Sequence, residues 1–89
     1  MPRISLTPNL CRHVDTPGGV FEGSTVGEAL AGYFEAHPAV RGYVLDDQGA
    51  VRHHVVVFVN GRPVSDRDGL SDEVAGDDTI FVFQSLSGG

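Results

Sequence analysis

The sequence predicts an α+β domain in which a mixed sheet of four or five strands packs on one main helix. Three observations lead to this fold class: an alternating apolar pattern opens the chain, one helical periodicity follows, and β-rich runs occupy the second half. A chain of 89 residues has room for one hydrophobic core. The expected order is strand, strand, helix, strand, short strand, strand.

The first strand is predicted over residues 3–7, where Ile4 and Leu6 alternate with polar neighbours. A loop follows, and Pro17-Gly18-Gly19 is typical of a turn. Residues 20–22 can then form a short second strand that pairs back on the first. These two strands begin the sheet.

One amphipathic helix of about three turns is predicted next. Thr25 and Glu28 stand in the spacing of a capping box, and Pro38 ends the helical run. Residues 39–48 read as a connecting segment with apolar anchors, closed by a turn over residues 46–49. The apolar positions at helical spacing are Val26, Ala29, Leu30, Tyr33, Phe34 and His37.

The second half of the chain supplies the centre of the sheet. Residues 55–59 are β-branched or aromatic and apolar on both faces, which predicts a central strand. Asn60-Gly61 is a strong hairpin signal into a short strand over residues 62–64. Residues 65–78 are acidic and loop-like, and residues 79–84 form the last strand.

Composition and charge exclude several classes of function. The net charge of −6 would repel a nucleic-acid backbone, so binding of DNA or RNA is not expected. All six basic residues are arginine, so these residues contain no lysine that could accept an isopeptide bond. One cysteine, Cys11, excludes an internal disulfide framework and a cluster of thiolate ligands. No membrane segment or signal peptide is recognised, and a cytoplasmic location is expected.

No pattern of metal ligands or of a catalytic dyad stands out. His13, His37 and the adjacent pair His53-His54 lack the spacing of a metal site and are interpreted as structural or surface residues. Cys11 is interpreted as a small buried hydrophobe or an idle thiol. The acidic stretch forms either a solvated surface or a docking surface for a basic partner; its members are Asp66, Asp68, Asp72, Glu73, Asp77 and Asp78.

The last residues differ in character, because the sequence ends Ser87-Gly88-Gly89. Glycine lacks a Cβ, so an extended pair of glycines can thread a channel that any side chain would block. A terminal carboxylate at Gly89 would be unhindered, and ATP could convert it into a reactive acyl-adenylate. A tail of six residues from Gln84 would reach up to about 20 Å, enough to enter the active site of another protein.

Three segments, in this order and spacing, resemble the ubiquitin-like sulfur carriers, the group of the molybdopterin-synthase small subunit and the thiamine sulfur carrier. They are the helix opening at residues 25–30, the hairpin at residues 57–61, and residues 76–80 leading to Gly88-Gly89. The length and the stretch over residues 41–70 look closest to the carriers of cysteine biosynthesis. The prolines that often precede the terminal glycines in that family are missing here.

The resemblance implies a β-grasp, ubiquitin-like domain over residues 1–83 and a flexible tail over residues 84–89. It also implies a protein co-substrate rather than an enzyme, with no bound cofactor. An E1-like partner would spend ATP to adenylate Gly89, and a sulfurtransferase or a sulfide source would convert it to a thiocarboxylate. A third, biosynthetic enzyme would accept the sulfur, and Gly88 would have to stay small to fit the partner's channel.

Partner docking is predicted beside the tail, at Phe81, Phe83 and Leu86. If Ile80 and Val82 face the helix, alternation turns Phe81 and Phe83 outward, although they could instead pack under the connecting segment. Three alternatives stay open for the whole chain: a protein modifier conjugated through Gly89, the small subunit of a molybdopterin synthase, and a purely structural module.

Overall fold

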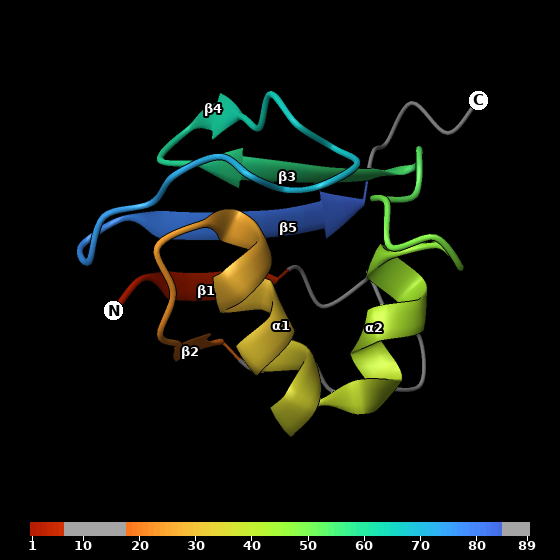
Figure 1. Ribbon diagram of the computed structural model, residues 1–89, viewed down its shortest axis with the longest axis horizontal. Helices are drawn as coiled ribbons and strands as arrows, with labels where there is room; N and C mark the ends of the chain where they lie inside the picture. Colours follow the sequence, from red (N-terminus) through yellow and green to blue (C-terminus); the bar gives the residue numbers. More distant parts are fainter. Residues whose placement is uncertain (7–17, 85–89) are drawn as a thin grey trace.

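A computed structural model describes residues 1–6 and 18–84 and shows a five-stranded mixed sheet with two helices (Figure 1). The strand order in the sheet is β2-β1-β5-β3-β4. The predicted fold class and order of strands are thus confirmed, with one helix more than the sequence predicts. The elements are β1 (Arg3–Leu6), β2 (Gly19–Val20), α1 (Val26–Ala36), α2 (Pro38–Val44), β3 (Val55–Val59), β4 (Arg62–Pro63) and β5 (Thr79–Gln84).

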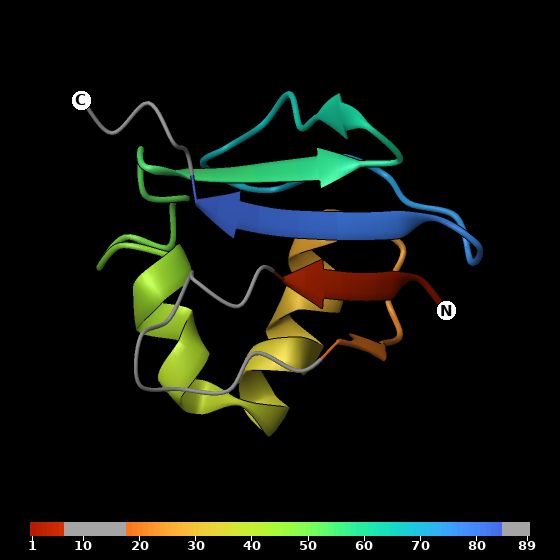
Figure 2. The ribbon, with the colours of Figure 1, turned by 180° about the vertical axis from the view of Figure 1, so that it is seen from behind.

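The last strand of the chain, β5, lies in the middle of the sheet. It runs parallel to β1 and antiparallel to β3, so that Ile80 pairs with Ile4 on one side and with Val59 on the other. Both helices lie on the face of the sheet turned toward the viewer in Figure 1, whereas the view from behind shows the strands free of any helix (Figure 2). The strand that leads to the tail is therefore held by two neighbours.

The hydrophobic core fills the space between the sheet and the two helices. Each fully buried aliphatic side chain contributes roughly 1.5–3 kcal/mol to folding. In α1, the ring of Tyr33 also packs edge to face on Phe21 at a centroid distance of 5.3 Å. The completely buried members come from every layer of the fold: Ile4, Val55, Val57 and Ile80 from the sheet, Val26, Ala29 and Tyr33 from α1, and Val40 and Val44 from α2.

Helix α1 begins where the capping box predicts. The Thr25 hydroxyl oxygen accepts the Glu28 N–H at 3.1 Å, and the Glu28 carboxylate accepts the N–H and hydroxyl of Ser24 at 2.8 and 2.9 Å. The loop over residues 64–78 supplies two further acceptors, because the Leu70 and Asp72 carbonyls take the N–H groups of the first turn at 2.9 Å. This loop is thereby tied to the start of α1.

The segment after α1 forms a second helix, α2, which corrects the prediction of one main helix followed by a connecting segment. Pro38 does end α1, but it also stands in the first turn of α2, where a missing N–H costs nothing. The expected apolar anchors of this segment are Val40, Tyr43, Val44 and Leu45. Val40 and Val44 form the buried face of α2, and Leu45 is buried just after it, whereas Tyr43 is wrong as an anchor because 37% of its surface is exposed. No helix in the described part of the chain is long and apolar enough to span a membrane.

The turns around the sheet follow the sequence signals closely. Asn60 and Gly61 both have positive φ, of 51° and 87°, as a tight hairpin between β3 and β4 requires. The Asn60 side chain then accepts the Thr79 N–H at 2.9 Å and donates to Asp78 at 2.7 Å, which fixes the start of β5. The predicted turn over residues 46–49 is confirmed, with Asp46 as its backbone acceptor.

The loop over residues 64–78 is also fastened to the start of β3 and the residues just before it. One guanidinium nitrogen of Arg67 donates to the carbonyls of Arg52 and Val55, each at 2.8 Å. The Arg67 carbonyl in turn accepts the Val51 N–H at 2.9 Å. Polar contacts thus hold this long irregular segment against both the start of α1 and the start of β3.

Candidate functional site

The predicted docking residues of β5 lie on the face of the sheet that no described helix covers. Ile80 and Val82 are buried under the helices, as the alternation predicts. Phe81 points to the other face and leaves 42% of its surface exposed. Phe83 points the same way and is half-buried. The alternative, in which these rings pack under the segment after α1, is wrong, because α2 lies on the opposite face.

Phe58 and Val56 of β3 join these two phenylalanines on the uncovered face. In the register of the two strands, Phe58 lies directly opposite Phe81, and Val56 lies opposite Phe83. The rings of Phe58 and Phe83 are 5.2 Å apart between centroids, with an interplanar angle of 55°. These four residues, Val56, Phe58, Phe81 and Phe83, are called the sheet patch below.

The sequence reasoning missed the β3 half of the sheet patch. A signal was present, because residues 55–59 are apolar at every position, including those that alternate away from the core. In a sheet covered on both faces such a run is ordinary, but here no described helix covers the second face. Apolar residues on a bare face of a sheet indicate an interaction surface.

The sheet patch has a basic neighbour on β1. Ser5 pairs with Phe81, and Arg3 pairs with Thr79, so alternation places both β1 side chains on the same face as the sheet patch. Arg3 is exposed. An apolar centre with an arginine at its rim is a common composition for a protein interface.

The other predicted site residues, Leu86, Gly88 and Gly89, lie outside the described residues, as do Cys11 and His13. The structure does locate the strand that leads to them. Val55 of β3 pairs with Gln84, the last residue of β5, so the chain leaves the sheet at the end where Phe83 lies. His53 and His54 form an exposed turn just before β3, with ring centroids 6.2 Å apart.

The acidic stretch is largely used by the fold itself. Asp66 accepts the N–H of Gly69 and the hydroxyl of Ser71, and these bonds lower the pKa of its carboxyl. Asp72 accepts the N–H groups of Ser65 and Asp66, which lower its pKa as well. The N–H of Ala75 and the Asn60 amide lower the pKa of Asp78. Three of the predicted surface acids are therefore internal acceptors that shape the loop.

The described residues bring together no metal site. Across residues 1–6 and 18–84, no group of three or more His, Cys, Asp or Glu side chains is placed to hold a metal ion. The most distinctive feature of these residues is the exposed apolar surface of the sheet patch.

Comparison with known proteins agrees with this architecture. The sequence model of the ThiS family matches residues 18–89. Small archaeal modifier protein 1 from Haloferax volcanii is 35% identical over 66 residues, which cover 74% of this chain and 71% of the relative.

Solved structures show the same fold over the whole chain. The crystal structure of SAMP1 from Haloferax volcanii has a TM-score of 0.77 and 28% identity, covering 99% of this chain and 98% of that one. A chain of the Amycolatopsis orientalis BexX/CysO complex has a TM-score of 0.80 and 22% identity, with 100% of both chains covered. At that identity the likeness concerns the fold alone. The fold, the family match and the identity to the archaeal relative together show that this chain belongs to the ThiS family of ubiquitin-like proteins, as its resemblance to the sulfur carriers predicts.

Proposed function

We propose that this chain is a sulfur carrier whose Gly89 carboxylate is activated by an E1-like enzyme and converted to a thiocarboxylate. The observation that carries the proposal is the ThiS family match, which runs through residue 89 and so includes the Gly88-Gly89 pair. Two residues without Cβ atoms suit a narrow channel in an activating enzyme. The body of the domain then serves to deliver the tail.

The chemistry requires two steps on the carboxyl carbon. A carboxylate oxygen of Gly89 attacks the α-phosphate of ATP, pyrophosphate leaves, and an acyl-adenylate forms. Sulfide, supplied directly or by a sulfurtransferase, then attacks the carbonyl carbon, and AMP departs with the oxygen. The resulting sulfur is more nucleophilic than the oxygen it replaces, and it attacks an acceptor held by a biosynthetic enzyme. ATP is consumed on the partner, and the carrier is a co-substrate.

The sheet patch supports a role in docking these partners. An enzyme that draws the tail into its active site must meet the end of β5 from which the tail departs. Phe83 and Val56 lie at that end, and Phe81 and Phe58 continue the apolar surface along the sheet. We assign partner binding to Phe81 and Phe83, with Leu86 as the apolar contact within the tail. Exposed aromatic side chains of this kind often dominate the binding energy of an interface.

The test is the intact mass of the protein after incubation with ATP, sulfide and the E1-like enzyme of its host. We expect a gain equal to the replacement of one oxygen by sulfur, absent without ATP and absent when Gly89 is deleted. Gly88→Phe should also abolish the gain. The matched control is Gly42→Ala in α2, where an added Cβ meets nothing within 4 Å, so that its mass gain should persist.

The proposal fails if Gly88→Phe is adenylated normally. It also fails if the unsubstituted chain gains no sulfur under conditions in which the same enzyme modifies another carrier. Circular dichroism of each variant shows whether the fold is intact, so that a loss of activation is assigned to the tail.

A second candidate function is protein modification, which the 35% identity to Small archaeal modifier protein 1 favours. The same activated Gly89 would then form an amide bond with a lysine amine of a target, and AMP would leave. Because all six basic residues here are arginine, a second copy of these 89 residues offers no lysine side chain as acceptor. Tagged protein in host cells should give covalent conjugates, lost on deletion of Gly89, if this function holds.

A further inference from the structure

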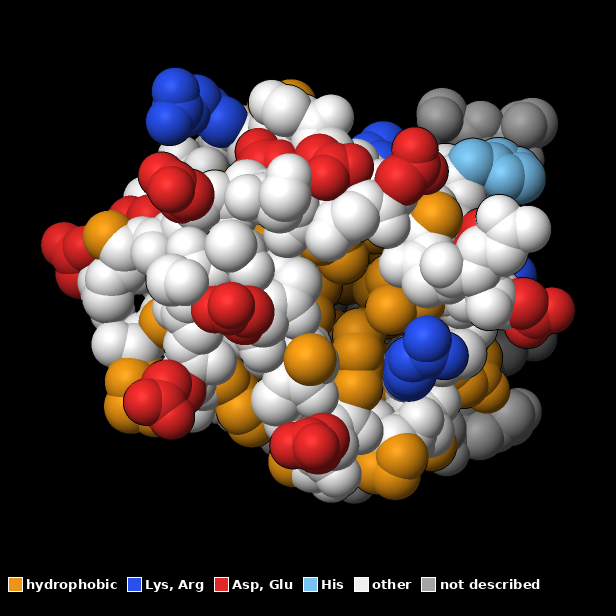
Figure 3. Space-filling view, in the orientation of Figure 1, with side chains coloured by type: hydrophobic (Ala, Val, Ile, Leu, Met, Phe, Trp, Pro, Cys, Tyr) orange, Lys and Arg blue, Asp and Glu red, His pale blue; other side chains and the backbone are white. Residues whose placement is uncertain are grey.

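The side of the molecule opposite the sheet patch carries a hollow of about 430 Å³, called the helical groove below. It lies between α1, the end of α2 and the loop over residues 64–78, and its floor is apolar (Figure 3). Its volume falls within the roughly 300–1,000 Å³ typical of ligand sites. The apolar walls come from Leu30, Phe34, Leu45 and Leu70.

Small residues keep the helical groove open. Gly27, Ala31, Gly49 and Gly69 all border it, so large parts of its rim have little or no side chain. At Gly27 an added Cβ would lie 3.2 Å from the Leu70 carbonyl oxygen, which shows how closely the loop approaches α1 there. These small residues leave room for the hollow between the two helices and the loop.

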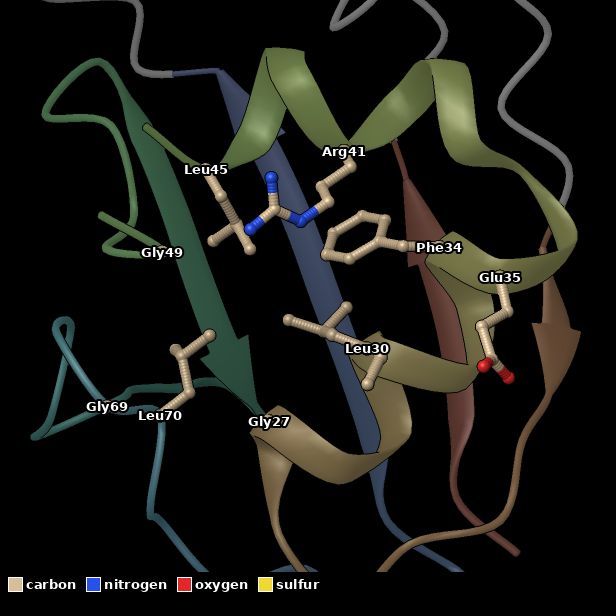
Figure 4. A pocket seen from close by; sticks show the side chains of 10 residues that line it. Gly27, Leu30, Phe34, Glu35, Arg41, Leu45, Gly49, Gly69 and Leu70 are labelled. Atoms are coloured by element: carbon tan, nitrogen blue, oxygen red, sulfur yellow. The ribbon is translucent and has the colours of Figure 1, made fainter. Parts of the chain in front are cut away.

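Arg41 places a cation at this apolar surface, and none of the described residues pairs with it. Arg41 is exposed and extends from α2 over the helical groove, between Leu45 and Phe34 (Figure 4). Within the described residues its guanidinium makes no ion pair or hydrogen bond. The other charged residue at the rim, Glu35, points away from Arg41 on the far side of Phe34. Arg41 can thus offer its planar donors to an incoming carboxylate.

We propose that the helical groove docks a segment of a partner protein in which a carboxylate side chain stands next to large aliphatic residues. The aliphatic side chain would lie against Leu30, Phe34 and Leu70, and the carboxylate would pair with Arg41. The groove is open along one side, so a small molecule would stay largely exposed there, whereas a protein segment would cover the opening. The groove lies on the side of the helices (Figure 3), and the sheet patch lies on the other face of the sheet, so two partners can bind at once.

The test is an NMR titration of the isotopically labelled full chain with a synthetic peptide. The probe is Gly-Leu-Glu-Leu-Gly blocked at both ends, so that the glutamate is its only charge, and the matched control replaces that glutamate with glutamine. We expect saturable shifts of the amides of Leu30, Phe34, Arg41, Leu45 and Leu70, and binding at least five-fold weaker for the glutamine peptide. This binding does not involve Gly89, so its failure leaves the mass assay unaffected.

Three variants make the titration specific. Arg41→Gln should weaken binding of the glutamate peptide at least five-fold, so that the glutamate and glutamine peptides bind with equal affinity. Arg62→Gln, an equal change of charge at an exposed site on β4, should leave both affinities unchanged. Ala31→Leu places a larger side chain at the rim of the groove, at an exposed position of α1, and should weaken binding of both peptides.

Several results would overturn the proposal. They are the absence of saturable shifts, shifts confined to the sheet patch, and equal binding by Arg41→Gln and the parent chain. Binding of octanoate in the helical groove without binding of the peptide would assign the groove to a small amphipathic acid and would also refute it. The spectrum of each variant reports directly whether the fold has been kept.

Discussion

The two faces of the sheet are both apolar, yet they are used in opposite ways. On β5, Ile80 and Val82 are buried under two helices, while Phe81, between them in sequence, is 42% exposed. The same contrast holds on β3, where Val57 is fully buried and its neighbour Phe58 lies in the sheet patch. Apolar character alone therefore does not define the core of this domain. Coverage by α1 and α2 decides which face stabilises the fold and which remains for recognition.

The largest effect is expected from a substitution on the covered face. Ile80→Ala removes a fully buried side chain between β1 and β3, and it should lower the free energy of unfolding by about 2–5 kcal/mol. Urea denaturation followed by circular dichroism measures this loss. The adjacent Phe81→Ala should cost clearly less, because 42% of the Phe81 surface is exposed and its contacts are cross-strand pairs. Equal losses for these two variants would contradict the distinction between the faces.

A smaller effect, in binding rather than stability, is expected on the uncovered face. Phe81→Ala should weaken the complex with the E1-like enzyme about ten-fold, since a central aromatic residue of an interface is lost. The matched control is Tyr43→Ala, which removes an aromatic ring of similar exposure, 37%, from α2. Isothermal titration calorimetry measures the affinity of each variant for the enzyme. If Tyr43→Ala weakens the complex as much as Phe81→Ala, the enzyme does not dock on the sheet patch.

The spacing of apolar residues predicts most of the strands and the first helix, because this spacing is a local property of each segment. In β5, side chains alternate between the two faces, so assigning Ile80 and Val82 to the core is sufficient to place Phe81 on the outer face. That the segment after Pro38 is a helix is not predictable in the same way. Proline suits both the end of one helix and the first turn of the next. Phe58 joins the sheet patch only through the register of β3 against β5, which depends on tertiary pairing.

The helical groove is even harder to predict from the sequence. It combines α1, α2 and the loop over residues 64–78, and no spacing along the chain relates Arg41 to Leu70. The acidic composition of this loop predicts a solvated surface or a docking surface for a basic partner, whereas three of its carboxylates accept N–H groups of the loop itself. An acidic residue type predicts an exposed side chain. Only the folded loop shows which carboxylates already accept hydrogen bonds within the domain.

The smallest effect is expected from acid, and it concerns the loop that borders the helical groove. Backbone N–H groups and the Ser71 hydroxyl lower the pKa of Asp66 in the folded state, so the unfolded chain binds its proton more tightly. Stability contributed by this carboxylate is therefore present above the unfolded pKa and is lost as the pH falls through the acid range below about 4. Asp66→Asn should lower stability at neutral pH and flatten its decline in acid, as urea midpoints at several pH values will show. Asp47→Asn, in an exposed turn where no described residue donates a hydrogen bond to the side chain, should leave stability at neutral pH unaltered. An identical acid slope for Asp66→Asn and the parent chain would mean that other groups hold the loop against the helices.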